Sequence, residues 1–278
     1  MKTKTLVAFF AITFGLTWGL GAMLMLFYDQ IVAIFGEVTP SNPLFILAVY
    51  APGIAGVILV LYHYGLRGLG SFLRRLTLWR APAPWWLFLI LGIPAIFYGG
   101  AALKGDIGPF PFSPWTAALP ALLSALLLGP IEELGWRGLA LPLLQRKYAP
   151  FWASLILGVI WALWHVPAFF ISGTPQSGWS ILPYFAGLIA LSVILTPLFN
   201  DARGSLLIAA LFHFQINNPV WPDAQPWDAV ILVIAAVVVV VLKRHDLFRK
   251  GAGVTTVLMP GDRLEAEPST VERKLAIS

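Results

Sequence analysis

The stretch that decides the fold reads WTAALPALLSALLLGPIEELGWRGLAL, residues 115–141. It begins as an apolar run of the kind that crosses a bilayer, which takes roughly 20 mostly apolar residues. The same segment then carries Glu132, Glu133 and Arg137. A charge at the bilayer centre costs at least about 2.5 kcal/mol, so ionisable groups inside a membrane span are candidates for function. The stretch therefore predicts a membrane helix with a polar site in it.

The composition of the whole chain agrees with a membrane protein. Of its 278 residues, 59% are hydrophobic and 11% are charged, and the mean hydropathy is +0.82. Soluble domains average roughly 25% charged residues, so a water-soluble globular protein is excluded. The net charge of +5 comes from short basic runs rather than one patch, so nucleic acid is not an expected partner. With no cysteine, disulfides, thiolate metal sites and cysteine nucleophiles are excluded.

Along the whole chain, the apolar pattern predicts an all-α integral membrane protein, a polytopic bundle of about eight transmembrane helices. The expected spans lie near residues 5–27, 44–63, 85–103, 115–141, 150–171, 179–199, 204–221 and 227–242. Lys and Arg gather in alternate connections and at both ends of this series. Because these residues concentrate on the cytoplasmic side, both termini are expected in the cytoplasm, with the bundle in the plasma membrane of a prokaryote.

Four regions follow from this division. Residues 1–114 hold three spans and a basic segment at 64–84 that alternates Arg with Leu. We expect this segment to form an amphipathic helix at the membrane surface, with a solvated basic loop as the alternative. Residues 115–221 form the polar core, and 222–250 hold the last span. Residues 251–278 have mixed charge and little apolar periodicity, so we expect a mobile cytoplasmic tail.

The two glutamates of the core are expected to have different roles. Glu133 and Arg137 are four residues apart, so they share a helix face and can pair. Glu132 points about 100° away and is free to act across the helix interface. The alternative is that all three form a buried ion-pair cluster or lie at the membrane interface. Just before them, Gly129 and Pro130 are expected to kink the helix.

Two later spans add histidines to this set. In the fifth span Trp161 lies one turn before His165, and in the seventh His213 and Asn217 share a face. A carboxylate near two histidines can hold zinc with an open position for water, or act directly as a general base. The amide of Asn217 can stabilise an oxyanion. Together these groups indicate hydrolysis of an amide or ester.

This combination resembles the CAAX protease and bacteriocin-processing (CPBP, or Abi) family of intramembrane proteases. The resemblance covers residues 115–221 and rests on three motifs. These are Glu-Glu-x-x-x-Arg at Glu132 to Arg137, aromatic-x-x-x-His at Trp161 to His165, and His-x-x-x-Asn at His213 to Asn217. Trp161 stands where Phe is commoner in the family, and we expect this aromatic to pack rather than react.

The resemblance implies an endopeptidase acting on a membrane-associated protein or peptide at the lipid bilayer. It implies that Glu132 and His165 activate the attacking water and that His213 and Asn217 support the oxyanion. Glu133 and Arg137 would orient the site.

The family is also described as metalloprotease-like, so zinc or another divalent metal stays an open cofactor. Its ligands would be Glu132, His165 and His213. Because the chain has no H-E-x-x-H spacing, those ligands would have to converge from separate helices. A metal-free water activated by glutamate is therefore favoured.

Two other classes of function fit the same residues. In an ion-coupled transporter, Glu132, Glu133, His165 and His213 would form a proton or substrate path. In a catalytically silent scaffold, their replacement would leave the phenotype intact. The sequence encodes no readable signal for the identity of the substrate, for its prenylation or for the oligomeric state.

Overall fold

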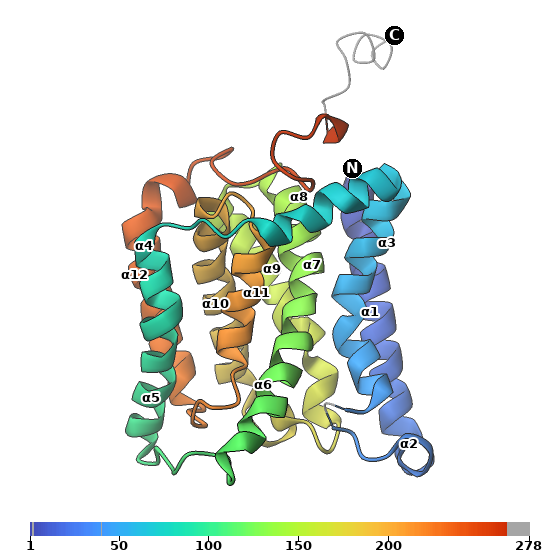
Figure 1. Cartoon of the computed structure of the whole chain (residues 1–278), viewed down its shortest axis with the longest axis vertical. Coiled ribbons are helices and arrows are strands. Elements are labelled where there is room, and N and C mark those ends of the chain that lie inside the picture. The colour runs from blue at the N-terminus through green and yellow to red at the C-terminus, as the bar shows by residue number, and fades with distance from the viewer. Residues whose placement is uncertain (2, 40, 266–278) are drawn as a thin grey trace.

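The protein, as a computed structural model, is described over residues 1, 3–39 and 41–265, where its regular structure is helical and contains no strand. Figure 1 shows most helices aligned with the long axis, with α1 and α3 at one side, α5 and α12 at the other, and α7, α9, α10 and α11 between them. The helices are α1 Thr3–Leu26, α2 Tyr28–Phe35, α3 Pro43–Arg74, α4 Ala83–Leu87, α5 Ile93–Lys104, α6 Ala118–Leu127, α7 Glu132–Gly135, α8 Leu141–Gln145, α9 Pro150–Trp164, α10 Ile181–Asp201, α11 Leu206–Ile216 and α12 Trp227–Leu247.

The predicted class, an all-α membrane protein with several spans, is confirmed. Within the described residues, 6 helical segments are long and apolar enough to cross a bilayer: Lys4–Leu26, Pro43–Thr77, Ala83–Lys104, Trp115–Gln145, Pro150–Phe170 and Ile181–Asp201. The expected span at 204–221 contains only the 11 residues of α11, about 16 Å of helix. The expected span at 227–242 lies within α12, whose last turns are charged. A count of eight spans therefore stays a prediction.

The basic residues of the connections meet at one end of the bundle, which we call the basic end. Arg146 Nη1 donates to the carbonyl of Met1 at 3.2 Å, and Arg75 Nε donates to that of Gly204 at 2.8 Å. The N-terminus and the last described residues lie at this same end in Figure 1. The alternation of charge along the sequence thus corresponds to two chemically different ends of the molecule.

The basic segment at 64–84 is helical over its first half. Gly65 has φ 63° and ψ −168°, a conformation that favours glycine, and there α3 bends. The rest of α3 then runs across the basic end (Figure 1) and finishes in the short turn Arg75–Thr77. One face, including Phe72, is buried in the core, while Leu66 and Leu73 are exposed. The placement of this helix at the membrane surface stays a prediction. The helix does not reach Pro82.

The long polar span is broken where the sequence predicts a kink. α6 ends at Leu127, a 3-10 turn covers Gly129–Ile131, and α7 starts at Glu132. Pro130 has no N–H for a helical bond, which accounts for the break. A π-helical turn at Trp136–Ala140 then leads into α8, and such turns occur often at functional sites.

Glycines fix α7 against α3. A Cβ on Gly135 would lie 2.2 Å from the carbonyl oxygen of Pro52, and one on Gly56 would lie 3.0 Å from that of Leu134. The two backbones therefore approach as closely as small residues allow, the usual device of membrane helix pairs. This contact fixes the position of the two glutamates of α7 along the axis of the bundle.

Residues 252–262, which we call the C-terminal strap, correct the expectation of a mobile tail from residue 251. Val257 and Leu258 are buried. Gln145 Nε2 donates to the Val254 carbonyl at 2.8 Å, and Arg75 Nη1 donates to that of Val257 at 2.6 Å. The strap is held by side chains that satisfy its backbone carbonyls, which apolar periodicity does not reveal. Residues 266–278 of the predicted tail lie outside the described residues.

Candidate active site

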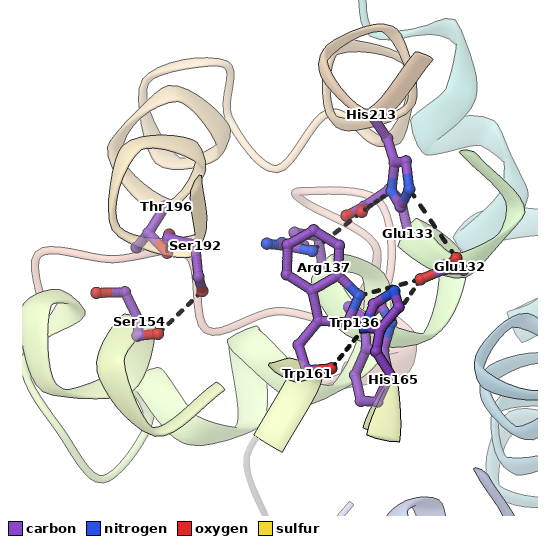
Figure 2. Close-up of polar contacts among 10 residues, drawn as sticks. All are labelled: Glu132, Glu133, Trp136, Arg137, Ser154, Trp161, His165, Ser192, Thr196 and His213. Carbon is purple, nitrogen blue, oxygen red and sulfur yellow. Dashed lines mark hydrogen bonds and ion pairs between the residues drawn. The ribbon is translucent and has the colours of Figure 1, made fainter. Parts of the chain in front are cut away.

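The two adjacent glutamates have different partners, as their positions on the helix predict. Glu133 Oε1 accepts from Arg137 Nη1 at 3.0 Å and from His213 Nδ1 at 2.6 Å. All three side chains are buried, with Arg137 0% exposed. Figure 2 shows this group beside Glu132, whose carboxylate lies to one side of that of Glu133. Glu133 is therefore neutralised by its own arginine and holds one ring nitrogen of His213.

Glu132 is held by two indole rings instead of a cation. Its Oε2 accepts from Trp136 Nε1 at 3.2 Å and from Trp161 Nε1 at 3.1 Å. Its Oε1 lies 3.9 Å from His213 Nε2, too far for a direct hydrogen bond. One oxygen is thus anchored, while the other faces the histidine across a gap.

Both histidines use Nδ1 for orientation. A carboxylate only accepts, so Nδ1 of His213 donates to Glu133 and Nε2 faces Glu132. A carbonyl also only accepts, so Nδ1 of His165 donates to the Trp161 oxygen at 2.8 Å. A neutral His165 then carries a lone pair on Nε2. In each ring the nitrogen left for chemistry is Nε2.

Trp161 connects the parts of the site. Its ring lies 5.8 Å from that of His165 and 5.6 Å from that of His213. The Arg137 guanidinium stacks over it at 4.6 Å. Besides packing, Trp161 donates its indole N–H to Glu132, a bond that Phe could not make.

Asn217 lies beside His213 at the end of α11. A Cβ on Gly129 would lie 2.4 Å from Asn217 Nδ2 and 2.8 Å from His213 Nε2. These two nitrogens therefore border the same point of the broken helix, next to Glu132. The amide of Asn217 is exposed and makes no side-chain hydrogen bond within the described residues.

Two residues that the motifs do not indicate also border the site. Trp136 lies four residues after Glu132, a spacing that places it on the correct face but does not show that its N–H bonds to the carboxylate. Tyr184 of α10 packs its ring 5.5 Å from that of His165. The Tyr184 hydroxyl accepts from Gln176 Nε2 at 3.4 Å. The contact of Tyr184 depends on helix packing, so no spacing in the sequence signals it.

The structure therefore brings together five of the six predicted residues through direct contacts or a shared border. They are Glu132, Glu133, Arg137, His213 and Asn217. His165 joins them through Trp161, because no hydrogen bond or ion pair in the described part of the chain links it directly to Glu132 or His213.

The residues named for a metal do not fit a three-ligand centre in this arrangement. Over residues 1, 3–39 and 41–265, no three His or acidic side chains converge as a metal site. One oxygen of Glu132 is already bonded to two indoles. Both histidines do present Nε2 with Nδ1 anchored, as metal-binding histidines do, and Nε2 of His213 faces Glu132. No contact within the described residues joins His165 directly to either of them.

Comparison with known proteins places this core among relatives. Residues 114–218 match the family model of type II CAAX prenyl endopeptidase Rce1-like proteins. CAAX prenyl protease 2 of Methanococcus maripaludis is 32% identical over 181 residues, which cover 61% of this chain and 65% of that protein. The chain thus spans just under two thirds of the relative's length. All six predicted site residues fall inside the matched segment. Through this segment, the chain is similar to the type II CAAX prenyl endopeptidase Rce1-like family, as the resemblance in its motifs predicts.

Proposed function

We propose that this protein is an intramembrane endopeptidase that hydrolyses a peptide bond of a membrane-associated protein or peptide. The observation that carries the proposal is the pattern of hydrogen bonds to the Glu132 carboxylate. One carboxylate oxygen is fixed by two indole N–H groups, and the other faces Nε2 of His213 across 3.9 Å. A buried carboxylate with one unbonded oxygen next to a histidine is suited to activating a water.

The attacking water would be held by two acceptors. Glu132 Oε1 and His165 Nε2 each take one of its hydrogens, because both atoms are left as acceptors by the bonds already described. The lone pair of the water is then directed at the substrate carbonyl. Glu132 receives the proton as the new carbon–oxygen bond forms.

The developing oxyanion would be stabilised by Asn217 and His213. Asn217 donates from Nδ2, and His213 donates from Nε2. Since Nδ1 of His213 also donates to Glu133, the ring is then an imidazolium. Its charge and that of Arg137 would balance those of the two glutamates. Burying a cluster of side chains with no net charge costs less free energy than burying one with an unpaired charge.

Collapse of the tetrahedral intermediate completes the reaction. The carbon–nitrogen bond breaks, and Glu132 returns its proton to the leaving amine, so that one water is consumed and a carboxylic acid and an amine are formed. Arg137 and Glu133 take no part in proton transfer in this scheme. They position His213. No step is assigned to a metal, because no three His or acidic side chains of the described residues form a metal site.

The names of the relatives suggest the substrate to assay first. Both the family and the Methanococcus protein are named for CAAX prenyl substrates. We therefore propose a C-terminal Cys-a-a-X peptide carrying a prenyl group on its cysteine as the substrate class. The same peptide without the prenyl group shows whether the lipid is required.

The proposal is tested with purified full-length protein in detergent and both fluorogenic peptides. His165→Ala is expected to lower kcat by about 100-fold or more, the range for loss of a general base. The matched control is His245→Ala, since His245 is exposed on α12 away from the site. Wild-type turnover by the His165 variant would contradict the mechanism, and absence of cleavage by the wild type of any peptide offered would favour a transporter.

A further inference from the structure

A small cavity at the basic end carries two arginines that the proposed reaction does not use. It measures about 220 Å³ and is lined by Thr77, Leu78, Trp79, Arg80, Ala202 and Arg203. It lies where the segment after α3 passes the turn between α10 and α11, and the Ser205 hydroxyl donates to the Leu78 carbonyl beside it. No acidic side chain lines the cavity.

The positive charge of this cavity is not neutralised by the chain. Within the described residues, neither Arg80 nor Arg203 has an acidic partner within 4.0 Å. Two acids at this end of the bundle, Asp201 and Asp262, are bonded to other residues. Asp201 accepts from Lys243 Nζ at 2.6 Å and from Trp85 Nε1 at 2.7 Å, and Asp262 pairs with Arg74 at 2.6 Å. Two arginines therefore line a cavity that has no acidic side chain in its lining.

Contacts fix the side chain of Arg80 and the backbone of Arg203. The Arg80 guanidinium stacks over the Trp79 ring, 5.7 Å from its centroid. Arg203 has φ 59°, in the left-handed region where Gly or Asn is the usual residue. Its N–H caps α10 by donating to the Asn200 carbonyl at 2.9 Å. An arginine kept at a position that favours glycine or asparagine points to a role for its side chain.

The exposed side chains around the cavity are of the kind found at the level of lipid headgroups. Trp79 is 62% exposed, and Leu73 and Leu76 of the neighbouring amphipathic turn are 37% and 39% exposed. Exposed Trp and Leu side chains on a basic helix are typical of the boundary between headgroups and acyl chains. Basic pockets between membrane helices at this level bind anionic lipid headgroups.

We propose that this cavity binds the phosphate of an anionic phospholipid headgroup, between the guanidinium groups of Arg80 and Arg203. The acyl chains would lie along Leu73 and Leu76, and Trp79 would cover the glycerol region. The site is independent of the proposed proteolysis, since it shares no residue with the candidate active site. It would fix the basic end at the anionic surface of the membrane.

The test measures lipid retention by full-length protein in neutral detergent, titrated with phosphatidylglycerol or phosphatidylcholine and read by native mass spectrometry. Arg80→Gln and Arg203→Asn are each expected to bind phosphatidylglycerol about fivefold more weakly, the factor for one basic residue at an anionic membrane surface. Asn tolerates the left-handed conformation, so the turn is kept. The matched control is Arg67→Gln, an exposed arginine of α3 that does not line the cavity, and it should bind as the wild type does.

A second arm separates a lipid from a free anion. Excess glycerol phosphate should displace little phosphatidylglycerol, because it lacks the acyl chains that rest on the leucines. Complete displacement by glycerol phosphate would overturn the lipid assignment. An equal loss of binding in the Arg67 variant, or none in the Arg80 and Arg203 variants, would likewise overturn the proposal. Thermal unfolding of each variant shows that it is folded.

Discussion

At the scale of residues, the contrast between two neighbouring carboxylates explains the site. Glu133 is bonded to Arg137 and His213, whereas Glu132 is bonded only to indole N–H groups at one oxygen. The spacing of Glu133 and Arg137 allowed their pairing to be predicted. The indole contacts could not be, because one comes from another helix and the other depends on the geometry at the start of the π turn.

The hydrogen bond from Trp161 to Glu132 should matter for turnover. Trp161→Phe removes the N–H but keeps an aromatic ring, and a hydrogen bond to a charged group contributes about 1.5–3 kcal/mol. We expect kcat to fall by about tenfold or more. Trp152→Phe, on the exposed face of α9, is the control and should leave kcat unchanged. Equal turnover of the two variants would show that the indole N–H does not orient the carboxylate.

Gly129 should tolerate no side chain. A Cβ there would lie 2.4 Å from Asn217 Nδ2 and 2.8 Å from His213 Nε2, so Gly129→Ala must displace both groups. A misplacement of about 1 Å in an active site can lower turnover about 100-fold. Gly19→Ala, with nothing near its Cβ, is the control. Steady-state cleavage rates of both variants, with their melting temperatures, distinguish lost geometry from lost folding. Full activity of the Gly129 variant would contradict the placement of these nitrogens.

At the scale of elements, the apolar periodicity and the positions of proline and glycine predicted most helices and the break in the polar span. Pro130 fixes that break locally, and Gly65 fixes the bend in α3. The C-terminal strap was not predictable, because its contacts run from distant side chains to its backbone. Such contacts leave no pattern in the sequence of the strap itself.

The attachment of the strap should depend on pH through Asp262. The hydroxyl of Ser71, together with the Arg74 guanidinium, holds the pKa of the Asp262 carboxyl below its ordinary value. A lowered folded-state pKa means that the contact stabilises the strap fully above about pH 4, the ordinary aspartate value. The stabilisation is lost as the pH falls through the lower folded-state pKa.

Hydrogen exchange of residues 252–262 measures this effect. We expect slow exchange at pH 6 and faster opening, corrected for intrinsic rates, at pH 3. Asp262→Asn should open the strap already at pH 6, whereas Asp246→Asn, an exposed control on α12, should not. Protection of the strap that is the same in all three proteins and at both pH values would rule out this carboxylate as its anchor.

At the scale of the whole molecule, the distribution of charge predicts orientation. The basic residues share one end of the bundle, and such ends face the cytoplasm. The chain has no cysteine, so single cysteines are unambiguous labels. Arg249→Cys should react with a membrane-impermeant maleimide only after cells are opened, and Asp106→Cys should react in intact cells. The reverse pattern would contradict the assignment of the basic end to the cytoplasm.

The central claim, a water activated by Glu132, is tested most directly by one set of cleavage assays. Wild-type protein, Glu132→Gln and the control Glu37→Gln, at an exposed glutamate, are each assayed with and without a strong chelator. We predict that only Glu132→Gln abolishes cleavage and that the chelator changes none of the rates. Persistent cleavage by Glu132→Gln would contradict the claim. Loss of wild-type activity with the chelator, restored by zinc, would contradict the metal-free form of the claim and make His165 and His213 metal ligands.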